Sequence, residues 1–215
     1  MTLILLPNLL AENTESSAFP PVIAEKVNVL QGLIAESDKG ARQFLKKFKK
    51  TVPVLLLNEH TKDFSDLLAP LLKGETWGLI SDAGLPCLAD PGSQLVEKAR
   101  EKKINVEAHV GPSSIILALM LSGLPSQKFF FHGYLPYELE ELKKLDKGVT
   151  HLFIEAPYRN IKSFQKIKQV LKPNARLCIA ANLMAPDAYV ETKIVSQWKD
   201  APSIDKVPSL FLIYT

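Results

Sequence analysis

Short apolar runs that stop abruptly at glycine, proline, serine or aspartate recur along this chain, and helical spacing follows most of them. The clearest case is Gly78–Ser93, GLISDAGLPCLADPGS, where the apolar run ends at Ser81. Glycine allows positive φ and close backbone approach, and proline prevents a strand from continuing. In an open α/β sheet, ligands bind beyond the carboxyl ends of the strands, so we expect a site in this loop. The alternative is that Asp82 and Asp90 are ordinary turn formers.

The first half of the chain alternates between β-prone and helical segments. Apolar composition and turn signals predict strands at residues 3–6, 33–35, 52–57, 79–80 and 104–110. Helical spacing predicts helices at 22–33, 40–50, 64–72 and 93–103. Residues 8–21 are polar and contain proline, so we expect a loop there. Such alternation predicts a mostly parallel sheet.

The second half is also α/β, with an apolar helix at 115–121 before it. We expect strands at 129–134, 152–155, 177–181, 190–195 and 209–214, an amphipathic helix at 161–171, and an exposed charged helix at 138–147. The fold class predicted is therefore α/β with two α/β domains. We place them at 1–122, with a mostly parallel sheet, and 123–215, with a mixed sheet; the boundary lies near Ser122 to Phe129.

Composition limits the classes of protein to consider. The chain has 215 residues, of which 47% are hydrophobic, enough for one or two globular domains. No apolar run approaches the roughly 20 residues of a membrane span, and the opening residues predict a first strand rather than a signal peptide. Two cysteines, Cys87 and Cys178, and four scattered histidines predict neither a disulfide framework nor a metal site. We therefore expect a cytoplasmic protein.

Positive charge is concentrated in the second half. Residues 1–112 carry 13 Lys and Arg against 14 Asp and Glu, whereas residues 113–215 carry 13 against 9. This distribution is compatible with an anionic partner without requiring one. The run Lys46–Lys50 is either a contact for phosphate or, the more common case, a solvated helix end.

Several of the expected strand-end loops resemble those of one enzyme family. The loop from Ser81 to Gly92 resembles the cofactor loop of the tetrapyrrole-methylase superfamily, and it is most similar to the branch of bacterial 16S ribosomal RNA cytidine 2′-O-methyltransferases. Further motifs follow in the order of that branch: Gly111-Pro112-Ser113-Ser114, Leu121-Ser122-Gly123-Leu124-Pro125, Gly133-Tyr134-Leu135-Pro136 and Glu155-Ala156-Pro157-Tyr158-Arg159.

The resemblance implies a cofactor and an assembly. It implies two α/β domains with S-adenosylmethionine in the cleft between them, usually in a homodimer, and a cofactor held largely by backbone atoms at strand ends. The positions that match the cofactor site are Pro7, Asp82, Ala83, Leu85, Ser113, Ser114, Ile154, Ala181 and Pro208. For Ser113 the alternative is a simple helix cap.

The chain departs from the branch on the substrate side. The branch's Thr-Pro-Ile-Gly-Asn loop is replaced by residues 8–12, NLLAE, and its Glu-Asp-Thr-Arg segment by residues 36–39, ESDK. Its Arg-Glu-Leu-Thr-Lys segment is replaced by residues 181–185, ANLMA. Retained cofactor motifs favour methyl transfer, and the altered substrate motifs leave the acceptor open. The resemblance therefore implies RNA as one acceptor and does not exclude others.

Methyl transfer from a sulfonium is an in-line displacement, in which the protein mainly aligns the reacting groups. A base assists when the acceptor is a ribose hydroxyl, and the candidates are Glu36 and Glu155; a structural ion pair is the alternative for each. Lys39, Arg42 and Arg159 are candidate substrate contacts, with surface solvation the alternative for the first two. Two other functions stay open: a methylase for a small molecule such as a tetrapyrrole, and a cofactor-binding module that has lost catalysis.

Overall fold

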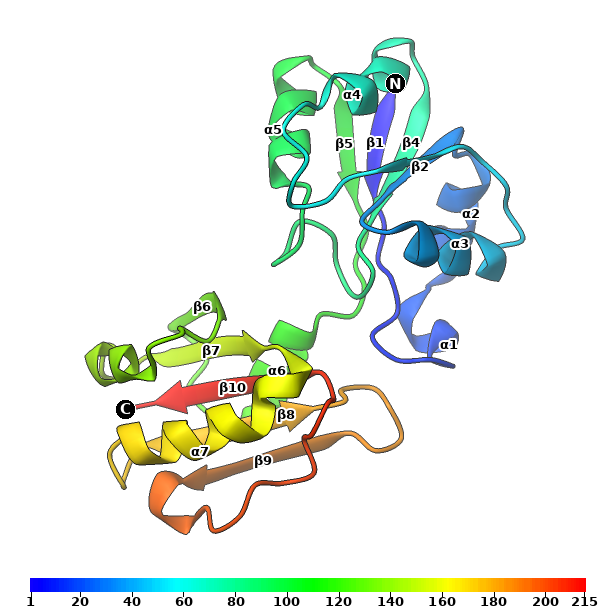
Figure 1. The fold of residues 1–215 in the computed structure, drawn as a ribbon. Coiled ribbons are helices and arrows are strands. Elements are labelled where there is room, and N and C mark those ends of the chain that lie inside the picture. The colour runs from blue at the N-terminus through cyan, green and yellow to red at the C-terminus, as the bar shows by residue number, and fades with distance from the viewer. The chain divides into compact units, whose positions relative to one another are not determined.

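The computed structural model describes residues 1–215, and the chain forms two compact units, residues 1–113 and 114–215 (Figure 1). Each unit is a five-stranded sheet with helices on both faces. None of the helices has the length and apolarity that crossing a bilayer requires. The predicted α/β class is confirmed, and each unit is described below by itself.

The sheet of the first unit is entirely parallel. Its strands lie in the order β3-β2-β4-β1-β5, and every recorded pairing between them is parallel, which confirms the predicted sheet type. The strands are β1 (Thr2–Leu5), β2 (Gly32–Ala35), β3 (Val54–Leu56), β4 (Thr76–Ile80) and β5 (Asn105–Ala108). The helices are α1 (Glu15–Ala18), α2 (Pro21–Asn28), α3 (Asp38–Lys47), α4 (Ser65–Leu72) and α5 (Ser93–Glu101).

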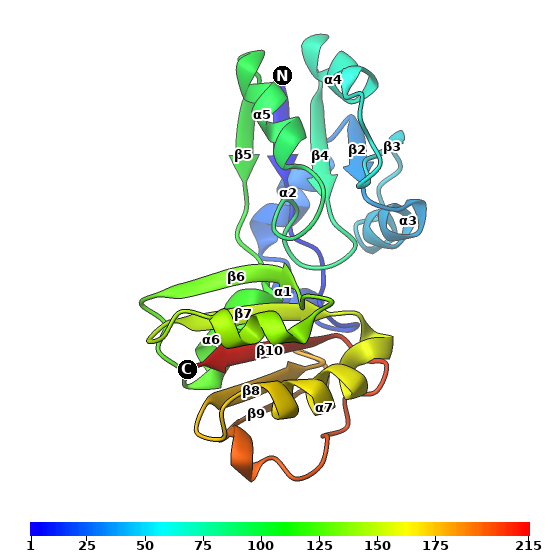
Figure 2. The same cartoon turned by 60° about the vertical axis from the view of Figure 1, so that its left-hand side comes forward.

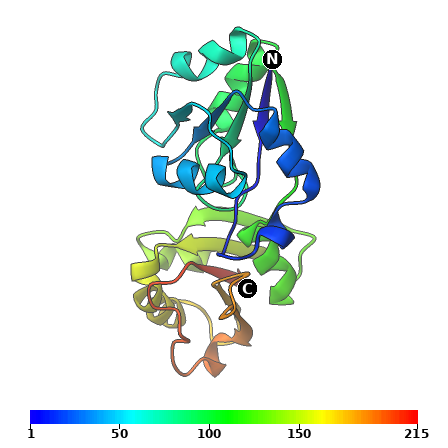
Figure 3. The same ribbon diagram turned by 90° about the vertical axis from the view of Figure 1, so that its right-hand side faces the viewer.

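Successive side chains of each strand enter two different cores. On β4, Leu79 packs with α4 and α5, whereas Ile80 packs with α2 and α3. Because both faces are covered by helices, the central strands are apolar throughout and not alternating. Figure 3 views the first unit from the side on which α2 and α3 lie. The unit is therefore doubly wound, with one pair of helices on each face.

The sheet of the second unit is mixed, as predicted, in the order β6-β7-β10-β8-β9 (Figure 2). Only β6 and β7 pair in parallel; the other pairings are antiparallel. The strands are β6 (Phe129–Tyr134), β7 (Thr150–Glu155), β8 (Arg176–Ala181), β9 (Tyr189–Ile194) and β10 (Ser209–Tyr214). Helix α6 (Ser114–Ser122) covers one face and α7 (Asn160–Val170) the other, and short 3₁₀ helices lie at Leu139–Lys144, Pro157–Arg159 and Val195–Gln197.

The division between the units falls earlier than the sequence predicts. The first unit ends at Ser113, whereas the predicted first domain runs to residue 122. The difference arises from α6, whose Ala118 and Leu119 pack against the second sheet. Those contacts assign the helix to the second unit, although its apolar composition is compatible with either.

Two predicted elements differ in kind from those observed. The segment at 138–147, expected as an exposed helix, contains a 3₁₀ helix that buries Leu139 and Leu142 in the core under α7. The loop expected at 8–21 contains the one-turn helix α1, which buries Ala18. In each case only one or two apolar residues of a polar segment are buried. So few apolar positions do not establish a helical repeat in the sequence.

Candidate active site at the strand ends of the first unit

The sheet of the first unit has a topological switch point between β1 and β4. After β1 the chain passes to α2 on one face, and after the adjacent β4 it passes to α5 on the other. At such a point the two connections diverge and leave a crevice in which α/β proteins bind ligands. Pro7 and Asn8 follow β1, and the loop Ser81–Gly84 follows β4. The topology therefore selects the loop that the sequence singled out.

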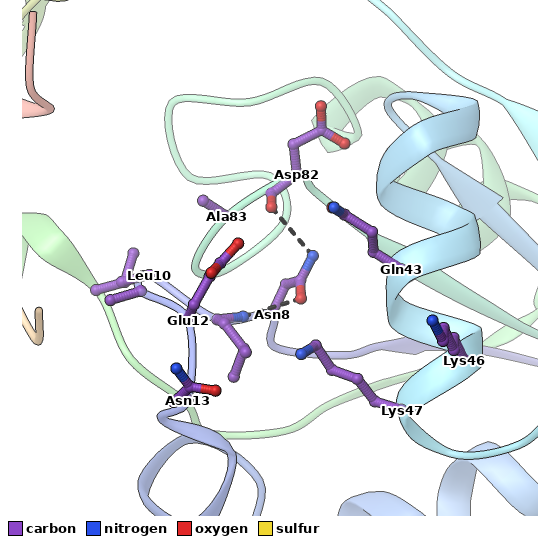
Figure 4. Close-up of a pocket in the computed structure, with 11 residues that line it drawn as sticks. Asn8, Leu10, Glu12, Asn13, Gln43, Lys46, Lys47, Asp82 and Ala83 are labelled. Carbon is purple, nitrogen blue, oxygen red and sulfur yellow. Dashed lines mark hydrogen bonds between the residues drawn. The ribbon is translucent and has the colours of Figure 1, made fainter.

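Asn8 joins these two strand ends. Asn8 is 6% exposed, and its Nδ2 donates to the carbonyl oxygen of Ser81 at 2.9 Å. The same Nδ2 donates to the carbonyl oxygen of Asp82 at 3.1 Å (Figure 4). Its backbone N–H donates to the Gly84 carbonyl at 2.7 Å. A buried amide with these bonds satisfied rigidifies both segments. Asn8 thus fixes the path of the loop after β4.

The loop after β2 also contacts the loop after β4. The Ser37 hydroxyl donates to Asp82 Oδ1 at 2.7 Å, and Glu36 Oε2 accepts from the Asp82 N–H at 3.1 Å. A Cβ placed on Gly40 would lie 2.1 Å from Asp82 Oδ1, so only glycine admits the aspartate here. The two loops and the first turn of α3 therefore form one structure around Asp82.

Carboxylates gather at this edge of the sheet. Burial, followed by the nearby charges of Glu36 and Asp82, raises the pKa of Asp90 to about 6, with the Ser81 hydroxyl opposing the shift. The chain contains no cluster of side chains suited to a metal ion. The neighbouring carboxylates of Glu36, Asp82 and Asp90 give this edge a negative electrostatic potential.

The rest of the loop after β4 is strained. Cys87 and Ala89 adopt φ of 67° and 69°, in the left-handed region that non-glycine residues occupy at a cost. A Cβ on Gly92 would lie 2.6 Å from the Cys87 sulfur. Burial, followed by the nearby charge of Asp90, raises the pKa of the Cys87 thiol to about 11, which favours the protonated thiol at neutral pH.

A pocket of about 560 Å³ borders this loop. We name it the α3 pocket; Figure 4 shows its residues, which are Asn8, Leu9, Leu10, Ala11, Glu12, Asn13, Gln43, Lys46, Lys47, Asp82 and Ala83. Its volume lies in the range of small-ligand sites. Of the residues predicted to hold a cofactor, Asp82 and Ala83 line it. Leu85 is half-buried nearby in the loop. Pro7 is buried and packs closely against Gly111, since a Cβ placed on Gly111 would lie 2.1 Å from the Pro7 Cβ.

Three predicted cofactor residues of the second unit lie at one end of its sheet. Strand β10 begins beside Pro208, and its first residue, Ser209, is paired with Glu155 on one side and Ala181 on the other. Ile154 is the next residue of β7 inward from that end, paired with Leu210. Ser113 and Ser114 stand at the junction of the two units. The structure thus brings Ile154, Ala181 and Pro208 together within the second unit.

Of the two candidate bases, Glu155 is held in a structural arrangement. It is 4% exposed; its Oε1 accepts from the Ala156 N–H at 2.8 Å, and its Oε2 accepts from the Ser163 hydroxyl. Arg159, the candidate substrate contact, lies 3.5 Å from the same Oε2. Glu36 is half-buried and uses one oxygen on the Asp82 N–H. The geometry therefore favours the structural alternative for Glu155 more than for Glu36.

The candidate substrate contacts of the first unit, Lys39 and Arg42, lie exposed on α3. Arg42 pairs with Asp38 one turn away at 2.7 Å. Sequence reasoning missed Asn8, Ser37 and Gly40 as site residues. The available signal was position, since each lies within a few residues of the carboxyl end of a parallel strand, where polar residues and glycine are functional more often than elsewhere.

The comparison with known families identifies the chain over most of its length. The model of the tetrapyrrole (corrin/porphyrin) methylases matches residues 21–194. The solved uroporphyrin-III-C-methyltransferase of Thermus thermophilus superposes with a TM-score of 0.64 at 15% identity, covering 99% of this chain and 94% of that one. The methyltransferase CobJ superposes with a TM-score of 0.63 at 12% identity, covering 100% and 98%. At these identities the two structures establish the fold alone.

Curated relatives share the name ribosomal RNA small subunit methyltransferase I. The protein of Xylella fastidiosa is 42% identical over 59% of this chain and 49% of its own length, and that of Thermotoga maritima 32% identical over 65% of each. The protein of Rickettsia prowazekii is 29% identical over 89% of this chain and 71% of its own length. The matches thus span about half to two thirds of the first two relatives. Since the family model covers residues 21–194 and the fold agrees, the chain belongs to the tetrapyrrole (corrin/porphyrin) methylase family.

Proposed function

We propose that the chain is an S-adenosylmethionine-dependent methyltransferase that methylates the 2′-oxygen of a ribose in small-subunit ribosomal RNA. The observation that carries the proposal is the site at the β1–β4 switch point, where the family's cofactor loop is fixed by Asn8 and Ser37. The names of the relatives support ribosomal RNA as the acceptor. Such an acceptor implies a cytoplasmic location.

The residues present fit the proposed cofactor. A sulfonium is an organic cation, and the carboxylates of Glu36, Asp82 and Asp90 give this edge the matching charge. When bound, the cofactor supplies an activated methyl group. We assign its contacts in the first unit to Pro7, Asp82, Ala83 and Leu85, at the junction to Ser113 and Ser114, and in the second unit to Ile154, Ala181 and Pro208.

Among the chain's carboxylates, we assign the base to Glu36. Its Oε1 makes no hydrogen bond, whereas both oxygens of Glu155 have partners. A ribose hydroxyl must lose its proton as the methyl group arrives, and a positioned carboxylate that takes this proton contributes roughly 10²–10⁴-fold to the rate. Glu155 instead fixes the start of α7 through Ser163.

Methyl transfer from radiolabelled S-adenosylmethionine tests the function directly. The acceptors are unmodified small-subunit ribosomal RNA and, separately, a panel of porphyrinoids. We expect label in the RNA, recovered as a 2′-O-methylnucleoside after digestion. Asp82→Arg should abolish transfer by placing a cation in the cofactor's position, while Glu101→Arg, at the far end of α5, should not. Absence of label from the RNA would reject this acceptor.

Two other functions have specific support. The description of the matching family, which names corrin and porphyrin methylases, favours a tetrapyrrole acceptor, which label in the porphyrinoid panel would identify. The changed segment at residues 181–185 favours a cofactor-binding module without catalysis. Tight cofactor binding in calorimetry, with no acceptor labelled in a whole-cell extract, would identify the module.

We further propose that the chain forms a homodimer through the outer face of α6. The helix reads SIILALMLS and has no charged residue. Ala118 and Leu119 face the sheet, yet Met120 is 72% and Leu121 58% exposed. A helix that is apolar on all sides is typical of one covered on all sides, so a second copy of the chain is the expected cover.

A further inference from the structure

The α3 pocket has a wall that cofactor binding at Asp82 and Ala83 leaves unused. This wall is formed by α3, from which Gln43, Lys46 and Lys47 line the pocket (Figure 4). The same helix begins at the cap that Ser37 provides beside Asp82. A ligand on this wall would therefore lie next to the proposed cofactor loop, where an acceptor has to be.

The wall is strongly basic. The segment 38–50, DKGARQFLKKFKK, contains six cations and a single acid, Asp38. Lys39, Arg42 and Lys46 are exposed and spaced three or four residues apart, so they share one face of α3. The opposite face is anchored in the core by Ala41, Phe44 and Leu45. The helix thus presents a fixed row of positive charge that leads into the pocket.

The two lysines that line the pocket have either no ion pair or only a weak one within the chain. Lys46 forms no ion pair in the structure, while Lys47 pairs with Glu15 at 2.5 Å in a partly exposed position. Exposed pairs of this kind contribute about 0–1 kcal/mol, so a phosphate can replace the glutamate at little cost. Both lysines are therefore available to an anion.

The other walls of the pocket have the opposite character. Glu12 provides a carboxylate and Asn13 an amide that both donates and accepts, whereas the Asp82 carboxylate points away from them toward Ser37 at the start of α3 (Figure 4). A ligand that fits these walls combines an anion for the lysines with a hydroxyl donor for the Glu12 carboxylate. A ribose-phosphate unit has both, since the 2′-hydroxyl is a donor as well as an acceptor.

We propose that the α3 pocket binds a ribose-phosphate unit of an RNA strand, with Lys46 and Lys47 on the phosphate. This inference rests on the proposed RNA acceptor and adds the surface that holds it. Lys39 and Arg42 extend the contact along the same helix toward Ser37.

The test compares two double variants. Lys46→Gln/Lys47→Gln removes the pocket cations, and Lys73→Gln/Lys102→Gln removes two exposed lysines that precede β4 and β5 at the opposite edge of the same sheet. Binding of transcribed small-subunit ribosomal RNA is measured by filter retention between about 50 and 300 mM KCl, a range over which the Debye length falls roughly twofold. Calorimetry with S-adenosylmethionine confirms that both variants keep the cofactor site.

We expect the pocket variant to bind RNA at least about tenfold more weakly at low salt. The slope of log K against log salt should be smaller by about 0.7, since the two lysines share one phosphate and each phosphate contact on a single strand contributes roughly 0.7. Lys46→Gln alone should lower the slope by about half as much. Equal affinity and slope in the two double variants would overturn the inference and leave the lysines as a solvated helix end. If the proposed function is wrong, the unmodified chain will transfer no methyl group to RNA. That result differs from a failure of the α3 pocket inference, in which the unmodified chain methylates RNA but the two double variants bind it equally.

Discussion

The Ser37 hydroxyl lies 2.7 Å from Oδ1 of Asp82 and donates to it, while Ser37 Oγ also accepts the N–H of Gly40 at 2.9 Å. One side chain therefore caps α3 and orients the aspartate of the loop after β4. Capping serines of this kind stabilise a helix by about 1 kcal/mol. Here the cap also couples the position of α3, with its basic face, to the proposed cofactor loop.

Gly40→Ala should weaken binding of S-adenosylmethionine with little effect on stability. The new Cβ would lie 2.1 Å from Asp82 Oδ1, so the carboxylate must turn away from Ser37. If the turned carboxylate loses one hydrogen bond to the cofactor, the Kd for S-adenosylmethionine should rise about 5- to 10-fold. Calorimetry measures the affinity, and urea denaturation should place the free energy of unfolding within about 1 kcal/mol of the parent because alanine favours helix.

A matched substitution on the same helix controls for propensity. Lys39→Ala also introduces an alanine in the first turn of α3, at an exposed position whereas Gly40 is buried, and it adds no atom near Asp82. Its affinity for the cofactor should equal that of the parent. Unchanged affinity in Gly40→Ala would show that the Asp82 side chain takes no part in cofactor binding.

Asp90→Asn should stabilise the protein at neutral and alkaline pH. The pKa of Asp90 is raised from 3.8 to about 6, so the folded chain binds this proton more tightly than the unfolded chain. The contribution of Asp90 to stability therefore falls as pH rises from about 4 to 6, and it stays low above pH 6. Since Asp90 is only half-buried, we expect a gain of about 1 kcal/mol above pH 6 that disappears below pH 4.

Urea denaturation from pH 4 to 8 measures this difference, with the exposed Asp200→Asn as control. A gain for Asp90→Asn that stays constant across the range would contradict the assignment, because a constant difference reflects packing and not a proton. The control should follow the parent at every pH.

Most of the fold could be predicted because most strands of both sheets are short, apolar and bounded by turn residues, although β5 and β9 also carry polar and charged residues. Helix ends were harder. The apolar spacing from Val22 to Leu33 predicts one long helix, but α2 ends at Asn28 and Leu33 belongs to β2. Leu30 and Leu33 are buried in the same core as α2, so their spacing is real although the backbone is not helical. Periodicity records which side chains are buried, not which backbone buries them.

The candidate site could be predicted only as a set of loops. Turn residues at strand ends select the loop around Asp82, but its partners Asn8 and Gly40 are distant in sequence, and their contacts depend on strand order. The order β3-β2-β4-β1-β5 places β1 beside β4, which no local pattern specifies. The long-range pairings that create the switch point were therefore beyond sequence reasoning, whereas the residue types that line it were not.

Glu36→Gln should lower the rate of methyl transfer about 10²- to 10³-fold. The amide cannot take a proton, yet its oxygen can still accept from the Asp82 N–H, so the loop keeps its position. The Kd for S-adenosylmethionine should change less than threefold in calorimetry, and kcat is measured with saturating RNA. A variant that keeps the parental rate would rule Glu36 out as the base.

Glu155→Gln should act on stability instead. Its carboxylate accepts from the Ala156 N–H and the Ser163 hydroxyl in a buried position, and the amide can replace only part of this arrangement. Hydrogen bonds to a buried charge contribute about 1.5–3 kcal/mol, and we expect a loss of that order in urea denaturation. The folded fraction should retain the parental rate to within a few fold. Unchanged stability together with a lost rate would reverse the roles of Glu36 and Glu155.

Met120→Glu should convert the proposed homodimer into a monomer. The Met120 side chain is 72% exposed on α6, so the substitution does not disturb the core of the second unit, but in a dimer it would bury an unpaired charge. Light scattering after gel filtration measures the mass against concentration. Gln165→Glu, which adds the same charge to an exposed position of α7, should leave the mass unchanged. A parent chain that is monomeric at tens of micromolar would refute the homodimer. A dimer that persists in Met120→Glu would place the interface away from α6.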